Sequence, residues 1–133
     1  MDRDALESRL SAFFGERAAD RSVLIAYLYG SRARGTERAG SDVDVAVLLE
    51  GPDGARFPTQ ALCLEDELES WLGLPVQVVS LREAPVDLVH RILRDGRLVH
   101  EQDRSTRIAF EVKARNEYFD LIRLLRICRS RGA

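Results

Sequence analysis

Two apolar runs separated by a polar segment constrain most strongly how this chain can fold. The first run covers residues 23–29, and the second covers residues 45–49. Continuous apolar runs of this length are typical of strands that are buried inside a sheet. We therefore predict strands over residues 23–29 and 42–50, with the first of them central in its sheet. In the second strand, alternation is expected to place four apolar residues on one face: Val43, Val45, Val47 and Leu49.

Small and acidic residues lie at the two boundaries between these strands and the segment that separates them. Gly30 and Ser31 directly follow the first strand, and Asp42 and Asp44 open the second. Because side chains alternate between the two faces of a strand, both aspartates are expected to point the same way. Two adjacent carboxylates repel each other unless a cation lies between them. A divalent metal that carries a polyphosphate is a natural cation for such a site.

The segment between the strands also offers groups that bind phosphate. Gly30 has no side chain, so a phosphate can approach its backbone closely. The Ser31 hydroxyl and the amides that follow it can donate hydrogen bonds, more effectively if a helical turn begins there over residues 31–34. Guanidinium groups pair well with phosphate, and the segment supplies three of them for the rest of a triphosphate: Arg32, Arg34 and Arg38. Without the two aspartates, the same residues would indicate only a turn with solvated arginines.

Composition limits the classes of function that fit this chain. Its 133 residues, of which 45% are hydrophobic and 32% charged, are expected to form a single domain over residues 1–133. The net charge of -2 argues against a protein that coats nucleic acid. The single lysine, Lys113, lies far from the glycines, which excludes a Walker-type phosphate site. We expect a cytoplasmic protein, because neither a secretory signal nor a membrane span is recognisable.

The cysteines and histidines do not indicate a metal site or a catalytic site. Cys63 and Cys128 are too few and too far apart for a zinc site, and their apolar neighbours predict two buried thiols. His90 and His100 lie outside any cluster of metal-ligating residues and are expected to be packed or on a helix surface.

The remaining chain alternates between helical and strand patterns. Apolar spacing predicts helices over residues 4–15, 58–72 and 85–95, and short strands over 76–79 and 97–100.

A long terminal helix is predicted over about residues 103–129. The apolar residues of its second half cover a wider arc of the helix surface than packing against one face of a small sheet requires. Two interpretations stay open: the helix covers the sheet, or part of it forms an interface with another chain.

The motif residues resemble those of a known superfamily. The pattern of Gly-Ser, ten residues and Asp-x-Asp is similar to the signature of the polymerase-beta-like nucleotidyltransferases, and the short chain resembles the minimal nucleotidyltransferases among them. The matching segments here are Gly30-Ser31-Arg32-Ala33-Arg34-Gly35 and Ser41-Asp42-Val43-Asp44. Further segments, within residues 81–85, 92–96 and 107–120, resemble the C-terminal half of MntA-type antitoxins.

This resemblance implies an α/β (α+β) nucleotidyltransferase fold, with a small mixed sheet of three to four strands flanked by helices and a long C-terminal helix. It implies binding of ATP with one or two Mg²⁺ ions, and transfer of a nucleoside monophosphate to a hydroxyl. In MntA-type antitoxins the acceptor is a tyrosine of a HEPN-family RNase toxin. Asp42 and Asp44 would then be the catalytic metal ligands, and the nucleotide would be bound by five residues: Gly30, Ser31, Arg32, Arg34 and Ser41.

One position departs from the superfamily pattern. Members usually carry a third carboxylate on the next strand, and the matching position here is Gln77. A glutamine is neutral and cannot take a proton from a hydroxyl. Either two aspartates are enough for a slow modification of one partner, or the chain binds nucleotide and neutralises its partner by covering it. An enzyme that modifies a small molecule is a third alternative, but relatives of that kind usually add a second domain.

Overall fold

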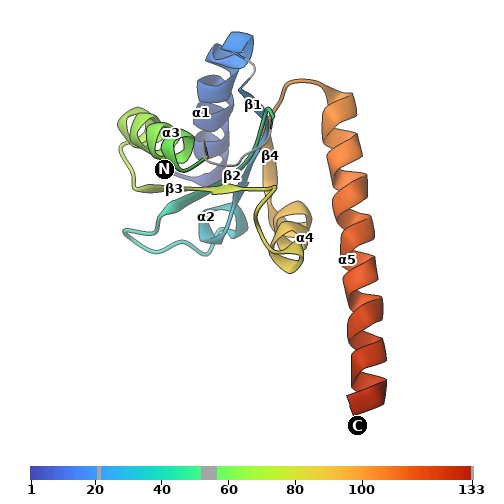
Figure 1. Ribbon diagram of the computed structural model, residues 1–133. Coiled ribbons are helices and arrows are strands. Elements are labelled where there is room, and N and C mark those ends of the chain that lie inside the picture. The colour runs from blue at the N-terminus through green and yellow to red at the C-terminus, as the bar shows by residue number, and fades with distance from the viewer. Residues whose placement is uncertain (21, 52–56, 133) are drawn as a thin grey trace.

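A sheet of four strands in the order β3-β2-β1-β4 forms the centre of the molecule (Figure 1). The computed structural model describes residues 1–20, 22–51 and 57–132. The strand β1 pairs antiparallel with both β2 and β4, whereas β2 and β3 run parallel. The sheet is therefore mixed, as the resemblance implied. The strands are β1 (Val23–Tyr29), β2 (Val43–Leu49), β3 (Val76–Ser80) and β4 (Arg97–Glu101).

Helices cover both faces of this sheet. The helices α1 and α3 pack on one face, and α4 and the first half of α5 lie over the other (Figure 1). Each predicted helix and strand is present, with bounds that differ from the prediction by at most three residues. The helices are α1 (Arg3–Glu16), α2 (Ser31–Arg34), α3 (Phe57–Leu72), α4 (Val86–Asp95) and α5 (Arg104–Gly132), with a 3-10 turn at Ala18–Asp20.

Alternation along β2 divides the core into two layers. Val43, Val45 and Val47 are fully buried in the layer that includes α1 and α3. Ala46 and Leu48 point the other way and belong to the layer beneath α4. The predicted assignment of the two faces is therefore confirmed. It also places the side chain of a residue such as Asp44 on the α4 side, because residues two apart share a face.

The outer edge of β3 is protected by two glutamates of α3. The backbone amide of Val76 donates to Glu69 Oε1 at 3.1 Å, and that of Val78 donates to Glu65 Oε1 at 2.9 Å. The two glutamates lie four residues apart, so they are neighbours on one side of the helix. Unpaired amides on an edge strand invite pairing with other chains, and these carboxylates occupy them.

We expect Glu65→Ala and Glu69→Ala each to lower the free energy of unfolding by about 1 kcal/mol, because each removes a charged hydrogen-bond acceptor that is open to solvent. Urea unfolding measures this loss. Glu67→Ala is the matched control, since Glu67 makes only an exposed ion pair with Arg17 and should cost less than about 0.5 kcal/mol. Equal losses in all three variants would contradict the edge-protecting role.

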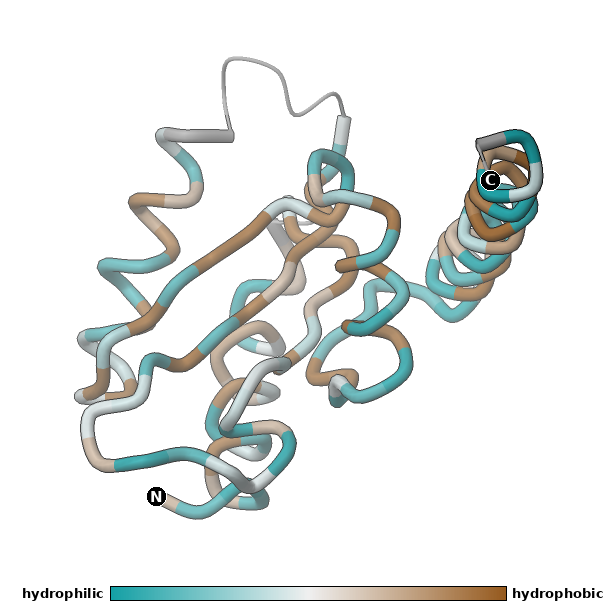
Figure 2. Tube along the Cα trace, turned by 90° about the horizontal axis from the view of Figure 1, so that it is seen from below, coloured by the Kyte–Doolittle hydropathy of each residue, from teal (hydrophilic) through white to brown (hydrophobic). Residues whose placement is uncertain are grey.

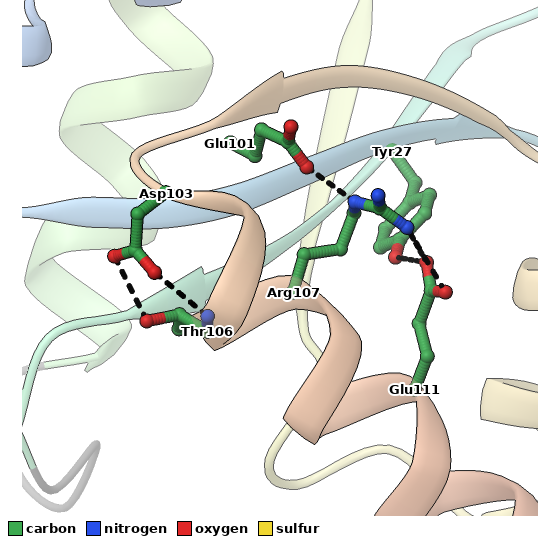
Figure 3. A network of polar contacts seen from close by, with 6 residues as sticks. All are labelled: Tyr27, Glu101, Asp103, Thr106, Arg107 and Glu111. Carbon is green, nitrogen blue, oxygen red and sulfur yellow. Dashed lines mark hydrogen bonds and ion pairs between the residues drawn. The ribbon is translucent and has the colours of Figure 1, made fainter.

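A polar network fastens the first turns of α5 to the sheet (Figure 3). The buried hydroxyl of Tyr27 on β1 donates to Glu111 Oε1 at 2.7 Å. Arg107 donates to the same carboxylate at 3.2 Å and also pairs with Glu101 at the end of β4. Burial, followed by the bond to Glu111, raises the pKa of Tyr27 well above its ordinary value, so this tyrosine stays a neutral donor. The network fixes the direction in which α5 leaves the sheet.

The second half of α5 extends beyond the rest of the molecule (Figure 1), and a view along this helix shows it standing apart from the sheet (Figure 2). Its contact with α4 includes Tyr118, which stacks on His90 with ring centroids 3.5 Å apart. Beyond that point large apolar side chains are open to solvent; Phe119 is 57% and Leu124 60% exposed. No helix among the described residues is long and apolar enough to cross a membrane.

The prediction of two buried thiols is wrong. Cys63 and Cys128 are both exposed. Cys63 lies on the outer side of α3, and Cys128 lies on the part of α5 that has left the sheet. Apolar neighbours in the sequence did not reveal which side of each helix would meet the core.

Candidate active site

Pairing of β1 with β2 brings the glycine of the motif against an aspartate of the motif. Tyr29 is the register partner of Asp44, so Gly30 comes directly after that pair. The backbone of Gly30 has φ +76°, and a Cβ built on it would lie 2.3 Å from Asp44 Oδ2. Only glycine combines this backbone conformation with the space that the carboxylate occupies.

A single helical turn, α2, follows the glycine at once. The carbonyl of Gly30 accepts hydrogen bonds from the amides of Ala33 and Arg34, both at 3.2 Å. Gly35 ends the turn in the left-handed conformation. The turn therefore holds Ser31 at the end of β1, and Arg34 is exposed beside it.

The side chain of Arg32 is hydrogen-bonded to the backbone of Ser41. The Arg32 side chain is only 7% exposed, and its Nε and Nη2 donate to the carbonyl of Ser41 at 3.1 and 3.0 Å. The hydroxyl of Ser41 accepts from the amide of Arg38 at 2.9 Å. These contacts fix the chain just before Asp42. In this structure Arg32 and Ser41 thus position the second half of the motif, whereas the exposed Arg34 is accessible to a ligand.

The charge of Asp42 acts on the ionisation of Asp44. Partial burial, followed by the charge of Asp42, raises the pKa of Asp44, and Arg34 acts in the opposite direction. Burial, helped by Asp44, raises the pKa of the neighbouring Tyr29 to about 12. Asp42 itself is exposed. Such a pair of carboxylates at the rim of a sheet is suited to a divalent cation, which would relieve their repulsion.

Gln77 lies beside Asp44. The two are register partners in the parallel pair of β2 and β3, so their side chains share the face that carries α4. Gln77 is exposed. Among the described residues no group of three or more His, Cys, Asp or Glu side chains could hold a metal ion. Two carboxylates still fit Mg²⁺, which commonly binds through one or two carboxylates together with phosphates of its substrate and retained waters.

A pocket of about 380 Å³ opens next to Gly30, on the side of α4. Its lining includes Arg34 of α2 and both Arg91 and Arg94 of α4. The sequence analysis assigned no function to the α4 arginines, because this helix was recognised from the spacing of its apolar residues, which lie on its other side. Their spacing of three residues, which puts them on one side of a helix, was the available signal. The other lining residues are Tyr29, Gly30, Leu88, Ile92 and Asp95.

The raised pKa of Asp44 gives a prediction for stability. A carboxyl group with a raised pKa in the folded state binds its proton more tightly there than in the unfolded chain. Ionised Asp44 therefore destabilises the metal-free fold at neutral pH. We expect Asp44→Asn to raise the Tm at pH 7 by roughly a few degrees or less. The gain should vanish as pH falls through the folded-state pKa toward the unfolded value of about 3.9.

Thermal melts in a chelator between pH 7 and pH 3.5 measure this effect. Asp66→Asn, at an exposed position of α3, is the matched control and should leave the Tm unchanged at each pH. A lower Tm for Asp44→Asn than for wild type at pH 7 would show that the ionised carboxylate stabilises the fold, contrary to this expectation.

A comparison with protein families agrees with this geometry. The family model described as "Polymerase beta, Nucleotidyltransferase" matches residues 16–105. A solved structure of a minimal nucleotidyltransferase is similar, with 31% identity and a TM-score of 0.59 over 72% of this chain and 94% of that chain. A search of curated proteins gave no significant match.

Chains of toxin-antitoxin complexes are similar over most of their length. A chain of a toxin-antitoxin complex with AMP-PNP shares 25% identity and a TM-score of 0.70, over 92% of this chain and 98% of that chain. A chain from a complex of a tri-AMPylated Shewanella oneidensis HEPN toxin with an MNT antitoxin shares 22% identity and the same fold. Its TM-score is 0.66, over 96% of this chain and 99% of that chain.

Proposed function

Since the chain belongs to the polymerase beta nucleotidyltransferase family, we propose that it is an antitoxin that transfers AMP from Mg-ATP to a tyrosine of a HEPN-family RNase toxin. The observation that carries this proposal is the contact of Gly30 with Asp44, which joins the phosphate-binding and metal-binding halves of the motif. The choice of nucleotide and partner is supported by similar chains from a complex with AMP-PNP and a complex with an AMPylated HEPN toxin. We further propose that residues 1–133 act as one domain.

In this proposal the residues of the motif have distinct roles. Asp42 and Asp44 hold the metal ion, which when bound would neutralise charge on the phosphates. The Ser31 hydroxyl donates to a phosphate oxygen, and Arg34 neutralises phosphate charge. Arg32 and Ser41 are positioning residues, because their contact is with each other.

The transfer itself exchanges one P–O bond for another. The tyrosine oxygen bonds to the α-phosphorus, while the bond from that phosphorus to the bridging oxygen breaks and pyrophosphate leaves. Correct placement of the attacking oxygen is the main contribution of the protein. Gln77, beside Asp44, can hydrogen-bond the incoming hydroxyl, but it cannot accept the proton, which therefore leaves to solvent.

The exposed half of α5 is proposed as the contact surface for the partner. Its large apolar side chains include Phe119, Leu124 and Ile127, each at least 46% exposed. Exposed apolar side chains gathered on one element favour an interface with another protein. This half of the helix emerges beside α4, whose arginines line the pocket next to Gly30. A partner bound here would lie near the site of transfer.

Gln77 favours a second candidate function. If a neutral residue at this position leaves catalysis too weak, the chain would bind nucleotide and neutralise the toxin by direct binding. The two candidates differ in whether the partner is modified.

Mass spectrometry of the partner after incubation with this chain, ATP and Mg²⁺ tests the proposed transfer. We expect added AMP on a tyrosine of the partner, and no addition when a chelator is present. A tight complex whose partner keeps its mass would refute the transfer and support neutralisation by binding alone.

A further inference from the structure

We propose that the pocket between α2, the end of β1 and α4 binds the terminal phosphates of the nucleotide and the pyrophosphate that leaves, with Arg91 and Arg94 as phosphate ligands. This inference rests on the proposed function and deepens it. It assigns a binding role to a helix outside the Gly-Ser and Asp-x-Asp segments.

The position of the pocket supports a phosphate ligand. Gly30 forms part of its wall, and Gly30 is also the residue whose backbone the Asp44 carboxylate closely approaches. Half-buried Tyr29 and buried Ile92 belong to the same lining. A chain of phosphates that begins at the aspartates would reach this pocket by passing the glycine, which has no side chain to block it.

The charges in the pocket complement those of a polyphosphate. Arg34, Arg91 and Arg94 supply three positive charges, against one carboxylate, Asp95. The two charges of one divalent ion are matched by Asp42 and Asp44, so the negative charge of a triphosphate stays uncompensated. Guanidinium groups match phosphate oxygens in both charge and geometry. The pocket therefore provides the cations that the metal-binding half of the site lacks.

The arginines are held in different ways. Arg94 donates from Nε and Nη2 to Asp95 at 3.0 and 2.8 Å, which fixes the plane of its guanidinium and leaves Nη1 outside this pair. Arg91 is 3.9 Å from Asp87 Oδ2 in a pair whose side chains are more than half exposed. Such a pair is weak, so Arg91 is free to turn toward a ligand.

Arg34 connects the two halves of the site electrostatically. The hydrogen bond from Arg94 is the first cause that lowers the pKa of Asp95, and the charge of Arg34 lowers it further. Arg34 also offsets the upward shift in the pKa of Asp44. Its guanidinium is therefore within electrostatic reach of both carboxylates, one at the proposed metal site and one in the pocket.

Titration calorimetry with Mg-ATP, AMP and pyrophosphate tests the proposal. Arg91→Gln should weaken binding of ATP and of pyrophosphate by about tenfold, and Arg91→Gln with Arg94→Gln by about a hundredfold or more. Affinity for AMP, which has no terminal phosphates, should change by less than about twofold. Arg104→Gln, at an exposed position where α5 begins, is the matched control and should behave as wild type.

Several outcomes would overturn the pocket assignment. Equal losses of affinity for ATP and AMP would mean that the arginines support the fold or the nucleoside site, and thermal melts of each variant separate those two cases. A loss of partner binding with unchanged affinity for ATP would assign the arginines to the protein acceptor instead.

The same measurements distinguish failure of the pocket from failure of the proposed function. Transfer to the partner with an ATP affinity that does not depend on Arg91 would retain the function and overturn the pocket. Pyrophosphate binding that depends on Arg91, without any transfer to the partner, would support the pocket and contradict the function.

Discussion

Replacing Asp42 and Asp44 together by asparagine should lower the rate of AMP transfer by on the order of a thousandfold or more. A metal ion at a phosphoryl site supplies several kcal/mol of transition-state stabilisation, and each 1.36 kcal/mol corresponds to about tenfold in rate. Asparagine keeps the size of both side chains but removes the charge that holds the ion. The rate of mass addition to the partner measures the effect.

We do not expect this double substitution to lower the stability of the fold. Burial and Asp42 both disfavour the charge on Asp44, so the neutral pair relieves repulsion in the metal-free chain. Asp66→Asn on α3 is the matched control, since it removes a carboxylate at an exposed position on a different helix. Undiminished transfer by the doubly substituted chain would refute the role of the two aspartates. Lost transfer with continued protection of cells from the toxin would show that binding alone neutralises it.

Gly30→Ala should damage both stability and activity. The glycine has φ +76° and ψ -158°, a region that is essentially restricted to glycine and costs other residues about 1–3 kcal/mol. The added Cβ would also lie 2.3 Å from Asp44 Oδ2, so the carboxylate must move. A displacement of about 1 Å in a catalytic group can cost roughly a hundredfold in rate. We therefore expect a Tm lower by several degrees and a transfer rate reduced by about a hundredfold or more.

Substitutions at two other glycines distinguish the effect of backbone strain from the effect of displacing the Asp44 carboxylate. Gly35 also has a positive φ, +75°, but a Cβ there meets no described atom within 4 Å. Gly35→Ala should therefore lose stability and keep most of its transfer activity. At Gly15, in α1, a Cβ has open space and ordinary backbone angles, so Gly15→Ala should be neutral or slightly stabilising. Thermal melts and transfer rates of all three variants check this order, and wild-type activity in Gly30→Ala would contradict it.

The helices and strands could be predicted from the sequence because their signals are local. The apolar run of residues 23–29 predicted β1 with its observed bounds, and alternation in β2 predicted which valines share a core layer. The turn at residues 31–34 entered the sequence analysis only as a condition for stronger hydrogen bonding by the amides, and the structure forms α2 there. Burial of an apolar face and the fixed period of each element determine these features within a few residues.

The roles of the arginines could not be predicted in the same way. Arg32 and Arg34 are two residues apart in a short motif and look equivalent in the sequence. The structure buries Arg32 against the carbonyl of Ser41 and leaves Arg34 exposed. Arg91 and Arg94 approach the same pocket from a helix about sixty residues further along the chain. Tertiary packing decides which arginine is buried against the protein and which one is open to a ligand. The spacing of residues within a turn or helix does not specify that packing.

By itself the sequence determined the paired motif: a glycine that ends one strand and two aspartates that open the next. The tertiary structure decided how closely the two parts meet, through the antiparallel pairing that sets Asp44 against Gly30. It also decided that Gln77 lies beside Asp44, and that the exposed half of α5 leaves the sheet next to α4. The physical reason is the range of the interactions. Side-chain alternation and apolar burial act within an element, whereas strand register and helix packing join residues far apart in the chain.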